Sequence, residues 1–237
     1  MDEQQFQRAL KENGITLSQN QLHQFDNYYR TLVNWNEKIN LTAITDKRSV
    51  YEKHFYDSLT PAFHFDLAEI NSLCDVGAGA GFPSIPLKIC FPHLHVTIVD
   101  SRKKRIIFLE QLISDLGLCN VNLYHDRAET FAHRSDVRES FDFVIARAVA
   151  NLATLCELCL PLVKMNGFFL AMKGSEIDDE CRDAQRALKI LGGELTSISS
   201  TMLPVEKSKR HLLFVKKIKQ TPKKYPRKPG IPSKMPL

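Results

Sequence analysis

The sequence of 237 residues contains no apolar run that approaches the roughly 18 residues needed to span a membrane. Its first residues, MDEQQFQRALKENG, also lack the apolar core of a secretory signal. We therefore expect a cytoplasmic protein without a membrane association. The hydrophobic content of 43% still provides enough apolar material for the buried core of one large domain.

Cysteine pairs at zinc-binding spacing are almost absent. Of the six cysteines, only Cys156 and Cys159 stand in a C-x-x-C pattern, and no second Cys or His pair follows at the required distance. We predict that the cysteines are free thiols packed as small apolar residues, and that the protein has no metal site.

Acidic residues are missing from the end of the chain. From Lys216 onward the sequence holds seven lysines, one arginine and no acid, so this stretch contributes +8 to a net charge of +5 and leaves −3 on the remainder. We expect three parts: a helical region at 1–65, a main domain at 66–219 and a C-terminal segment at 220–237. The C-terminal segment lacks the apolar periodicity of core elements, which predicts a mobile segment. It is either a solvated tail or an arm that contacts a polyanion.

Hydrophobic periodicity divides the chain into two kinds of structure. Apolar residues recur every three or four positions between Leu22 and Ile39, which predicts an amphipathic helix, and a second helix is expected over 46–59. From residue 72 onward short apolar runs alternate with helical patterns, which predicts an α/β fold with a parallel sheet between two helical layers. The predicted strands are 72–76, 95–100, 121–125, 141–146, 167–173, 194–203 and 211–218. The predicted helices are 83–91, 103–116, 151–164 and 176–191. Only a short connection joins the last two strands, which predicts an antiparallel hairpin at one edge.

Glycine is scarce, with ten residues, yet Gly77, Gly79 and Gly81 fall together directly after the first predicted strand. Ligands of open α/β sheets bind beyond the carboxyl ends of the strands, and glycine lets a ligand approach the backbone. Asp100 ends the next strand, where its carboxylate can accept hydrogen bonds from a ribose diol. The G-x-G-x-G spacing differs from the G-x-G-x-x-G pattern of dinucleotide-binding sites. No Lys-Ser/Thr pair follows the glycines, which excludes the phosphate-binding loop of nucleotide triphosphate sites. The pattern favours an adenosine-containing cofactor; the alternatives are a tight turn without a ligand and a nicotinamide-dependent enzyme, whose Tyr-x-x-x-Lys is missing.

Charged residues follow three of the other strands. DRAE at 126–129 follows the third strand, and Arg147 follows the fourth, where it suits a phosphate, a guanine edge or a salt bridge at the rim. SRKKR opens the helix after Asp100. Cations at a helix N-terminus oppose the helix dipole, so these side chains either bind phosphate or extend into water.

Several motifs in this order resemble one known family. They are NWNEKINLTAI, HFYDSL, DVGAGAGFPSIPL, VDSRKKRIIFLEQL, RAE, ARAVANL, MKG and KRHLLFVKK. Together they resemble the RsmG family, once called glucose-inhibited division protein B, over nearly the whole chain. The resemblance implies a Rossmann-like class I methyltransferase sheet that depends on S-adenosylmethionine (SAM) and is preceded by a helical region. It also implies methylation of N7 of guanine 527 in the 530 loop of bacterial 16S rRNA.

The resemblance implies a set of site residues. The cofactor contacts are Gly77, Gly79, Phe82, Asp100, Ala128, Glu129 and Arg147, and the residues in family motifs on the RNA side are His54, Asp57, Lys173, Arg210 and His211. The basic SRKKR run adds Lys103, Lys104 and Arg105 as candidates for RNA contacts. Phe82 could alternatively stack on a base, and Asp57 lies in a family motif without an assigned role. One departure is Ser84, which stands where the family usually has glycine.

Guanine N7 has a free lone pair at neutral pH, so its methylation needs positioning and no general base. We therefore predict no catalytic acid or base, with Arg147 and Lys173 as candidates for orienting the substrate. The expected partner is 16S rRNA or the 30S ribosomal subunit, and the expected state is a monomer. A rival hypothesis is an RNA-binding protein that keeps the methyltransferase scaffold without catalysis.

Overall fold

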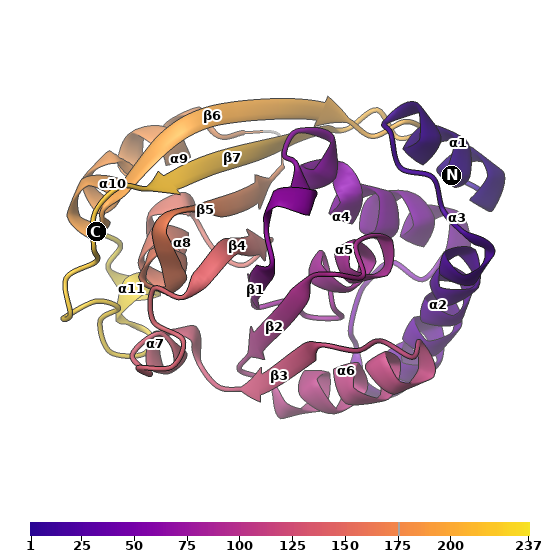
Figure 1. The fold of residues 1–237 in the computed structure, drawn as a ribbon, viewed down its shortest axis with the longest axis horizontal. Coiled ribbons are helices and arrows are strands. Elements are labelled where there is room, and N and C mark those ends of the chain that lie inside the picture. The colour runs from indigo at the N-terminus through magenta and orange to yellow at the C-terminus, as the bar shows by residue number, and fades with distance from the viewer. Residues whose placement is uncertain (175) are drawn as a thin grey trace.

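The computed structural model describes residues 1–174 and 176–237, and its centre is a seven-stranded sheet in the order β3-β2-β1-β4-β5-β7-β6 (Figure 1). The strands β1 to β5 run parallel, whereas β7 pairs antiparallel with both β5 and β6. The strand bounds are β1 (Ser72–Val76), β2 (His95–Asp100), β3 (Val121–His125), β4 (Phe141–Arg147), β5 (Val163–Lys173), β6 (Gly193–Met202) and β7 (Lys209–Lys217). The predicted α/β fold and the antiparallel hairpin are confirmed.

Helices cover both faces of the sheet (Figure 1). One side carries α1 (Glu3–Glu12), α2 (Gln19–Ile39), α3 (Lys47–Val50), the π-helix η1 (Tyr51–Tyr56), α4 (Asp57–Leu59), α5 (Ser84–Cys90) and α6 (Lys103–Asp115). The other carries α7 (Ala128–Phe131), α8 (Leu152–Cys159), α9 (Asp178–Asp183), α10 (Gln185–Leu191) and α11 (Ile231–Lys234). Short 3₁₀ turns lie at η2 (Thr60–Phe63), η3 (Leu67–Glu69) and η4 (Leu160–Leu162).

Alternation along the strands explains the two-sided core. Successive strand side chains point to opposite faces, so Phe143 and Ile145 of β4 join the hydrophobic cluster under α2 and α5, whereas Val144 and Ala146 join the cluster under α8. Because both faces are covered, the middle of β4, Phe143–Ala146, is apolar on both sides.

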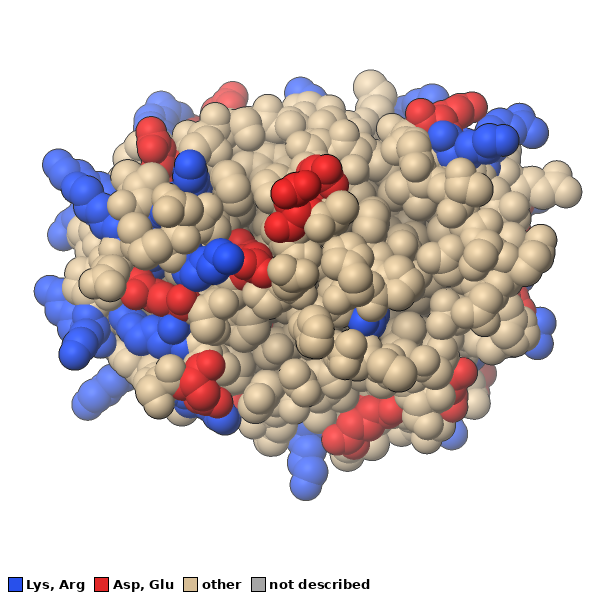
Figure 2. Space-filling view, viewed as in Figure 1, with Lys and Arg blue, Asp and Glu red and all other residues tan. Residues whose placement is uncertain are grey.

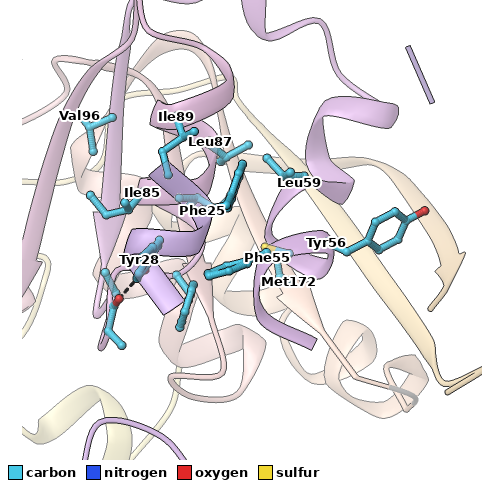
Figure 3. Packing of buried hydrophobic residues seen from close by; sticks show 14 of the residues in the cluster. Phe25, Tyr28, Phe55, Tyr56, Leu59, Ile85, Leu87, Ile89, Val96 and Met172 are labelled. Carbon is cyan, nitrogen blue, oxygen red and sulfur yellow. Dashed lines mark hydrogen bonds between the residues drawn. The ribbon is translucent and has the colours of Figure 1, made fainter. Parts of the chain in front are cut away.

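The N-terminal helices pack on the sheet through aromatic side chains (Figure 3). Phe25 of α2 and Phe55 of η1 are fully buried, with ring centroids 5.1 Å apart. Tyr28 of α2 donates a hydrogen bond to the Ala80 carbonyl at 2.5 Å, which ties this helical layer to the loop after β1 (Figure 3). The helices thus support the glycine-rich loop from beneath.

Three predicted elements differ from the structure. The helix expected over 151–164 ends at Cys159, since Val163 already begins β5, and the helix expected over 176–191 is divided into α9 and α10. The helix expected over 46–59 contains the π-helix η1. The division into 1–65, 66–219 and 220–237 remains a prediction.

The C-terminal segment was expected to be mobile, and this expectation is wrong. Thr221, Tyr225 and Pro232 are buried, and Tyr225 belongs to the cluster that includes α8. Polar contacts also hold it, because Arg138 donates hydrogen bonds to the carbonyls of Thr221 and Tyr225 at 3.0 and 2.9 Å. Lys223, Lys224 and Lys228 remain exposed. Basic side chains gather on the left of Figure 2, the side on which this segment lies in Figure 1.

Candidate functional site

A pocket of about 540 Å³ lies at the carboxyl ends of β1, β2, β3 and β4. All of the residues predicted to bind the cofactor line it: Gly77, Gly79, Phe82, Asp100, Ala128, Glu129 and Arg147. They come from four separate loops, which meet because parallel strands place their carboxyl ends at one edge of the sheet. Their individual roles remain predictions.

The glycine-rich loop gives this first pocket an open backbone floor. Gly77 and Gly79 have φ angles of +78° and +61°, a region that side-chain-bearing residues rarely adopt. A Cβ on Gly77 would lie 3.0 Å from a Val149 methyl carbon, whereas the nearest atom to a Cβ on Gly79 would be Arg105 Cζ at 3.9 Å. A ligand can therefore lie against bare backbone at Gly79.

Asp100 is held in place at the end of β2. Its Oδ1 accepts a hydrogen bond from the Arg102 amide at 2.9 Å, and its Oδ2 accepts from the Gly79 amide at 3.2 Å. Arg105 Nη1 also contacts Oδ2 at 3.1 Å. Arg105, predicted to hold RNA, thus lies in the first pocket beside the carboxylate, while Lys103 and Lys104 extend into solvent at the start of α6.

A buried carboxyl group lies beneath the loop, and the sequence analysis missed it. Asp75 of β1 has 0% exposure, and its Oδ2 accepts a hydrogen bond from the Ser84 amide at 3.1 Å. Burial raises the pKa of Asp75 to about 7 against the hydrogen bonds from Ser84. Ser84, the residue that departs from the family pattern, is itself buried in α5 and does not line the first pocket.

A second pocket of about 330 Å³ adjoins the first, and the two share His54, Arg147 and Ala148. The predicted RNA-side residues His54, Lys173, Arg210 and His211 all line the second pocket, together with Lys53 and Asp57. Lys103 and Lys104 line neither pocket. The shared residues mark the place where a group in one pocket can meet a group in the other.

His54 stands at this junction on the π-helix η1, a type of helix that is frequent at functional sites. Its ring stacks on Phe82 with centroids 4.5 Å apart, and its Nε2 lies 2.8 Å from Thr42 Oγ1. Burial and the nearby Arg147 lower the pKa of His54 to about 3, so the ring is neutral near pH 7. Phe82 also stacks on Tyr28 and is 5% exposed, which argues against base stacking by Phe82.

A buried acid joins two arginines on the floor of the second pocket. Arg147 Nη1 lies 2.9 Å from Asp57 Oδ2, and Arg210 Nε lies 3.4 Å from Asp57 Oδ1. Burial raises the pKa of Asp57, although both arginines oppose this. The salt bridge considered for Arg147 therefore exists, and the same side chain also lines both pockets.

Two further predicted residues have partners within the chain. Lys173 Nζ donates to the Ala150 carbonyl and pairs with Glu180, both at 2.6 Å. His211 is 5% exposed, and its Nδ1 lies 2.9 Å from Ser200 Oγ. These contacts fix the wall of the second pocket.

Residues 1–174 and 176–237 contain no group of three or more His, Cys, Asp or Glu residues suited to a metal ion. Cys156 and Cys159 are free thiols, fully buried in α8. None of the helices described here is both long and apolar enough to cross a membrane.

Comparison with known proteins agrees with the geometry. A family model described as rRNA small subunit methyltransferase G matches residues 21–213. The chain belongs to this family. A relative of that name from Bacillus subtilis (strain 168) is 60% identical over 237 residues, covering 100% of this chain and 99% of its own. Another from Geobacillus sp. (strain WCH70) is 58% identical and is covered completely in both chains.

Solved structures show the shared fold. A 16S rRNA (adenine-N1)-methyltransferase mutant from Catenulisporales acidiphilia has a TM-score of 0.51 at 16% identity, covering 64% of this chain and 87% of its own. The TYW2 protein of M. jannaschii, solved in complex with AdoMet, has a TM-score of 0.54 at 14% identity, covering 73% and 78%. The fold is therefore that of class I methyltransferases. As a member of the rRNA small subunit methyltransferase G family, the protein is a SAM-dependent rRNA methyltransferase.

Proposed function

We propose that the protein methylates N7 of guanine 527 in the 530 loop of 16S rRNA. The observation that carries this proposal is the contact between the two pockets at His54, Arg147 and Ala148. One pocket has the open glycine backbone and the carboxylate that suit an adenosine cofactor, and the other has the charged floor that suits a base.

The residues of the first pocket fit SAM. The open backbone at Gly79 accommodates a close ligand, and Asp100 accepts hydrogen bonds from the ribose diol. Ala128 and Glu129 lie on the adenine side, and Phe82 and Arg147 border the end that faces the second pocket. When bound, SAM supplies an electrophilic methyl group on its sulfonium sulfur.

The second pocket offers complementary groups for a flipped-out guanine. Arg147 and Arg210 are donors for the guanine O6, and a carboxylate accepts from the N1–H and N2–H₂ groups of the same base. Among residues 1–174 and 176–237, the buried Asp57 Oδ1 has no hydrogen-bond partner, although Arg210 lies nearby. Binding by these edges leaves N7 free to face the first pocket.

No residue of the site needs to remove a proton. N7 attacks with its own lone pair, and the task of the protein is to hold it in line with the methyl group. His54 is neutral near pH 7 and already stacked on Phe82, which suits a fixed wall at the junction. Lys103 and Lys104 are exposed near the first pocket and are available to RNA phosphates.

The substrate is 16S rRNA or the 30S subunit, since the family modifies small-subunit rRNA. The protein works as a monomer in the cytoplasm, where this RNA is found.

The test is incubation of the purified protein with radiolabelled SAM and unmodified small-subunit rRNA, followed by mapping of the methylated base. We expect one N7-methylguanine at position 527, with no label on RNA in which adenine replaces that guanine. Parallel reactions with 30S subunits identify the form that is methylated.

Other outcomes would reject the proposal. Label on a different atom or base would contradict the assignment of the target while leaving the enzyme class intact. RNA binding without methyl transfer to either substrate would support the rival hypothesis of a scaffold that has lost catalysis.

A further inference from the structure

The C-terminal segment (residues 220–237) is fastened at Arg227. The Arg227 guanidinium forms an ion pair with Glu157 of α8, whose side chain has 0% exposure. Nη2 lies 2.6 Å from Oε2, Nε lies 2.9 Å from Oε1, and the backbone amide donates to Oε1 at 2.7 Å. A carboxylate removed from water needs such partners. The segment therefore has one defined position against α8.

Beyond Arg227 the segment reaches the first pocket. Ser233 is one of the residues that line it. The neighbouring Pro232 is buried, and its carbonyl accepts a hydrogen bond from Thr154 Oγ1 of α8 at 3.1 Å. This contact fixes the backbone on which Ser233 stands. In Figure 1, α11, which carries both residues, lies close to α7 and α8.

The segment also contacts a residue assigned to the cofactor. The Gly230 amide donates a hydrogen bond to Glu129 Oε1 at 2.8 Å. Glu129 is 8% exposed, and its other oxygen, Oε2, lies 3.9 Å from Arg127 Nε. Because one oxygen is held by the Gly230 backbone, the carboxylate has a fixed orientation at the edge of the first pocket.

We infer that the C-terminal segment is a working part of the cofactor site: Ser233 forms one wall, and Gly230 positions Glu129. Binding of SAM and anchoring of the segment then stabilise each other, because each favours the same arrangement of the pocket edge. This inference rests on the proposed placement of SAM in the first pocket. The alternative is that the C-terminal segment only stabilises the packing on α8 and has no effect on the affinity for the cofactor.

The test compares two bulky substitutions at exposed positions of the full-length protein, Ser233→Trp and Met235→Trp. Both native side chains are exposed, so neither change disturbs a buried contact, but only Ser233 lines the pocket. Binding of S-adenosylhomocysteine, the product left after methyl transfer, is measured by calorimetry. We expect at least a tenfold loss of affinity for Ser233→Trp and less than a twofold change for Met235→Trp, with equal thermal melting of the two variants.

Hydrogen exchange gives a second readout on the unaltered protein. Saturating S-adenosylhomocysteine should slow exchange of the backbone amides between Gly230 and Met235 at least threefold. Equal affinity of Ser233→Trp and the unaltered protein, or exchange rates that the ligand does not change, would overturn the inference.

Asp100→Ala separates this inference from the proposed function on which it rests. If Asp100→Ala weakens binding and Ser233→Trp does not, only the role of the C-terminal segment is wrong. If Asp100→Ala binds as tightly as the unaltered protein, the placement of SAM in the first pocket is itself wrong.

Discussion

The free energy of unfolding of the unaltered protein should fall as the pH rises because of Asp75, and replacing Asp75 with asparagine should abolish this fall. Burial raises the pKa of this fully buried carboxyl group from 3.8 to about 7. Between these two values the folded protein holds a proton that the unfolded chain has released, so the free energy of unfolding falls as the pH rises. Applied between pH 5 and pH 8, these pKa values give a loss of about 3 kcal/mol, which the asparagine variant should lack.

The assay is urea unfolding at pH 5 and pH 8, comparing the unaltered protein with Asp75→Asn. The pKa of His54 is shifted in both proteins, so its contribution cancels. Asp142→Asn is a matched control. Burial would raise the pKa of Asp142, but hydrogen bonds, led by that from Lys164, lower it to about 2. Asp142 is ionised throughout this pH range, so its removal should cost the same at both values. An equal loss between pH 5 and pH 8 for the unaltered protein and Asp75→Asn would refute the reasoning.

Three further predictions concern ligands. Asp100→Ala should weaken SAM binding by about 1.5–3 kcal/mol, measured by calorimetry, since a charged acceptor is lost; Lys104→Ala, at an exposed position in the first turn of α6 outside the first pocket, should leave it unchanged. Arg210→Met should reduce RNA affinity in filter binding by about tenfold without changing SAM affinity; a loss of both would contradict two separate pockets. Alanine at both Lys223 and Lys224 should flatten the dependence of log K for RNA on log salt by about 1, and an unchanged slope would show that this surface does not touch RNA.

Much of the sheet could be predicted because its strands are short, apolar and bounded by clear breaks. The bounds of β1, β2 and β3 agree with the sequence pattern residue for residue. Strand β5 begins at Val163, earlier than the expected residue 167, because the 3₁₀ turn η4 with its Pro161 ends the helical stretch directly before that residue. The pocket at the strand ends could be predicted for the same reason, since topology places those ends together.

Tertiary contacts that no local pattern encodes could not be predicted. The C-terminal segment carries few apolar residues, yet the pair between Arg227 and the buried Glu157 holds it in place. Glu157 is separated from Arg227 by 70 residues in the sequence and lies in the otherwise apolar helix α8. No local sequence pattern therefore predicts which residue pairs with it. Arg105 likewise belonged to a basic run in the sequence, but the fold turns it toward Asp100.

The pH dependence of methyl transfer should come from Asp75 and not from a histidine. His54 lies at the junction of the pockets, but its pKa of about 3 keeps it neutral across pH 6–8, and attack by N7 needs no base. Asp75 has a pKa of about 7 and hydrogen-bonds to α5 directly beneath the glycine-rich loop. Its ionisation near neutrality would place a charge under that loop and loosen the first pocket. We therefore expect that any ionisation near pH 7 in the single-turnover rate at subsaturating SAM disappears in Asp75→Asn and persists in His54→Gln. An ionisation that His54→Gln abolishes would mean that the histidine takes part in the reaction after all.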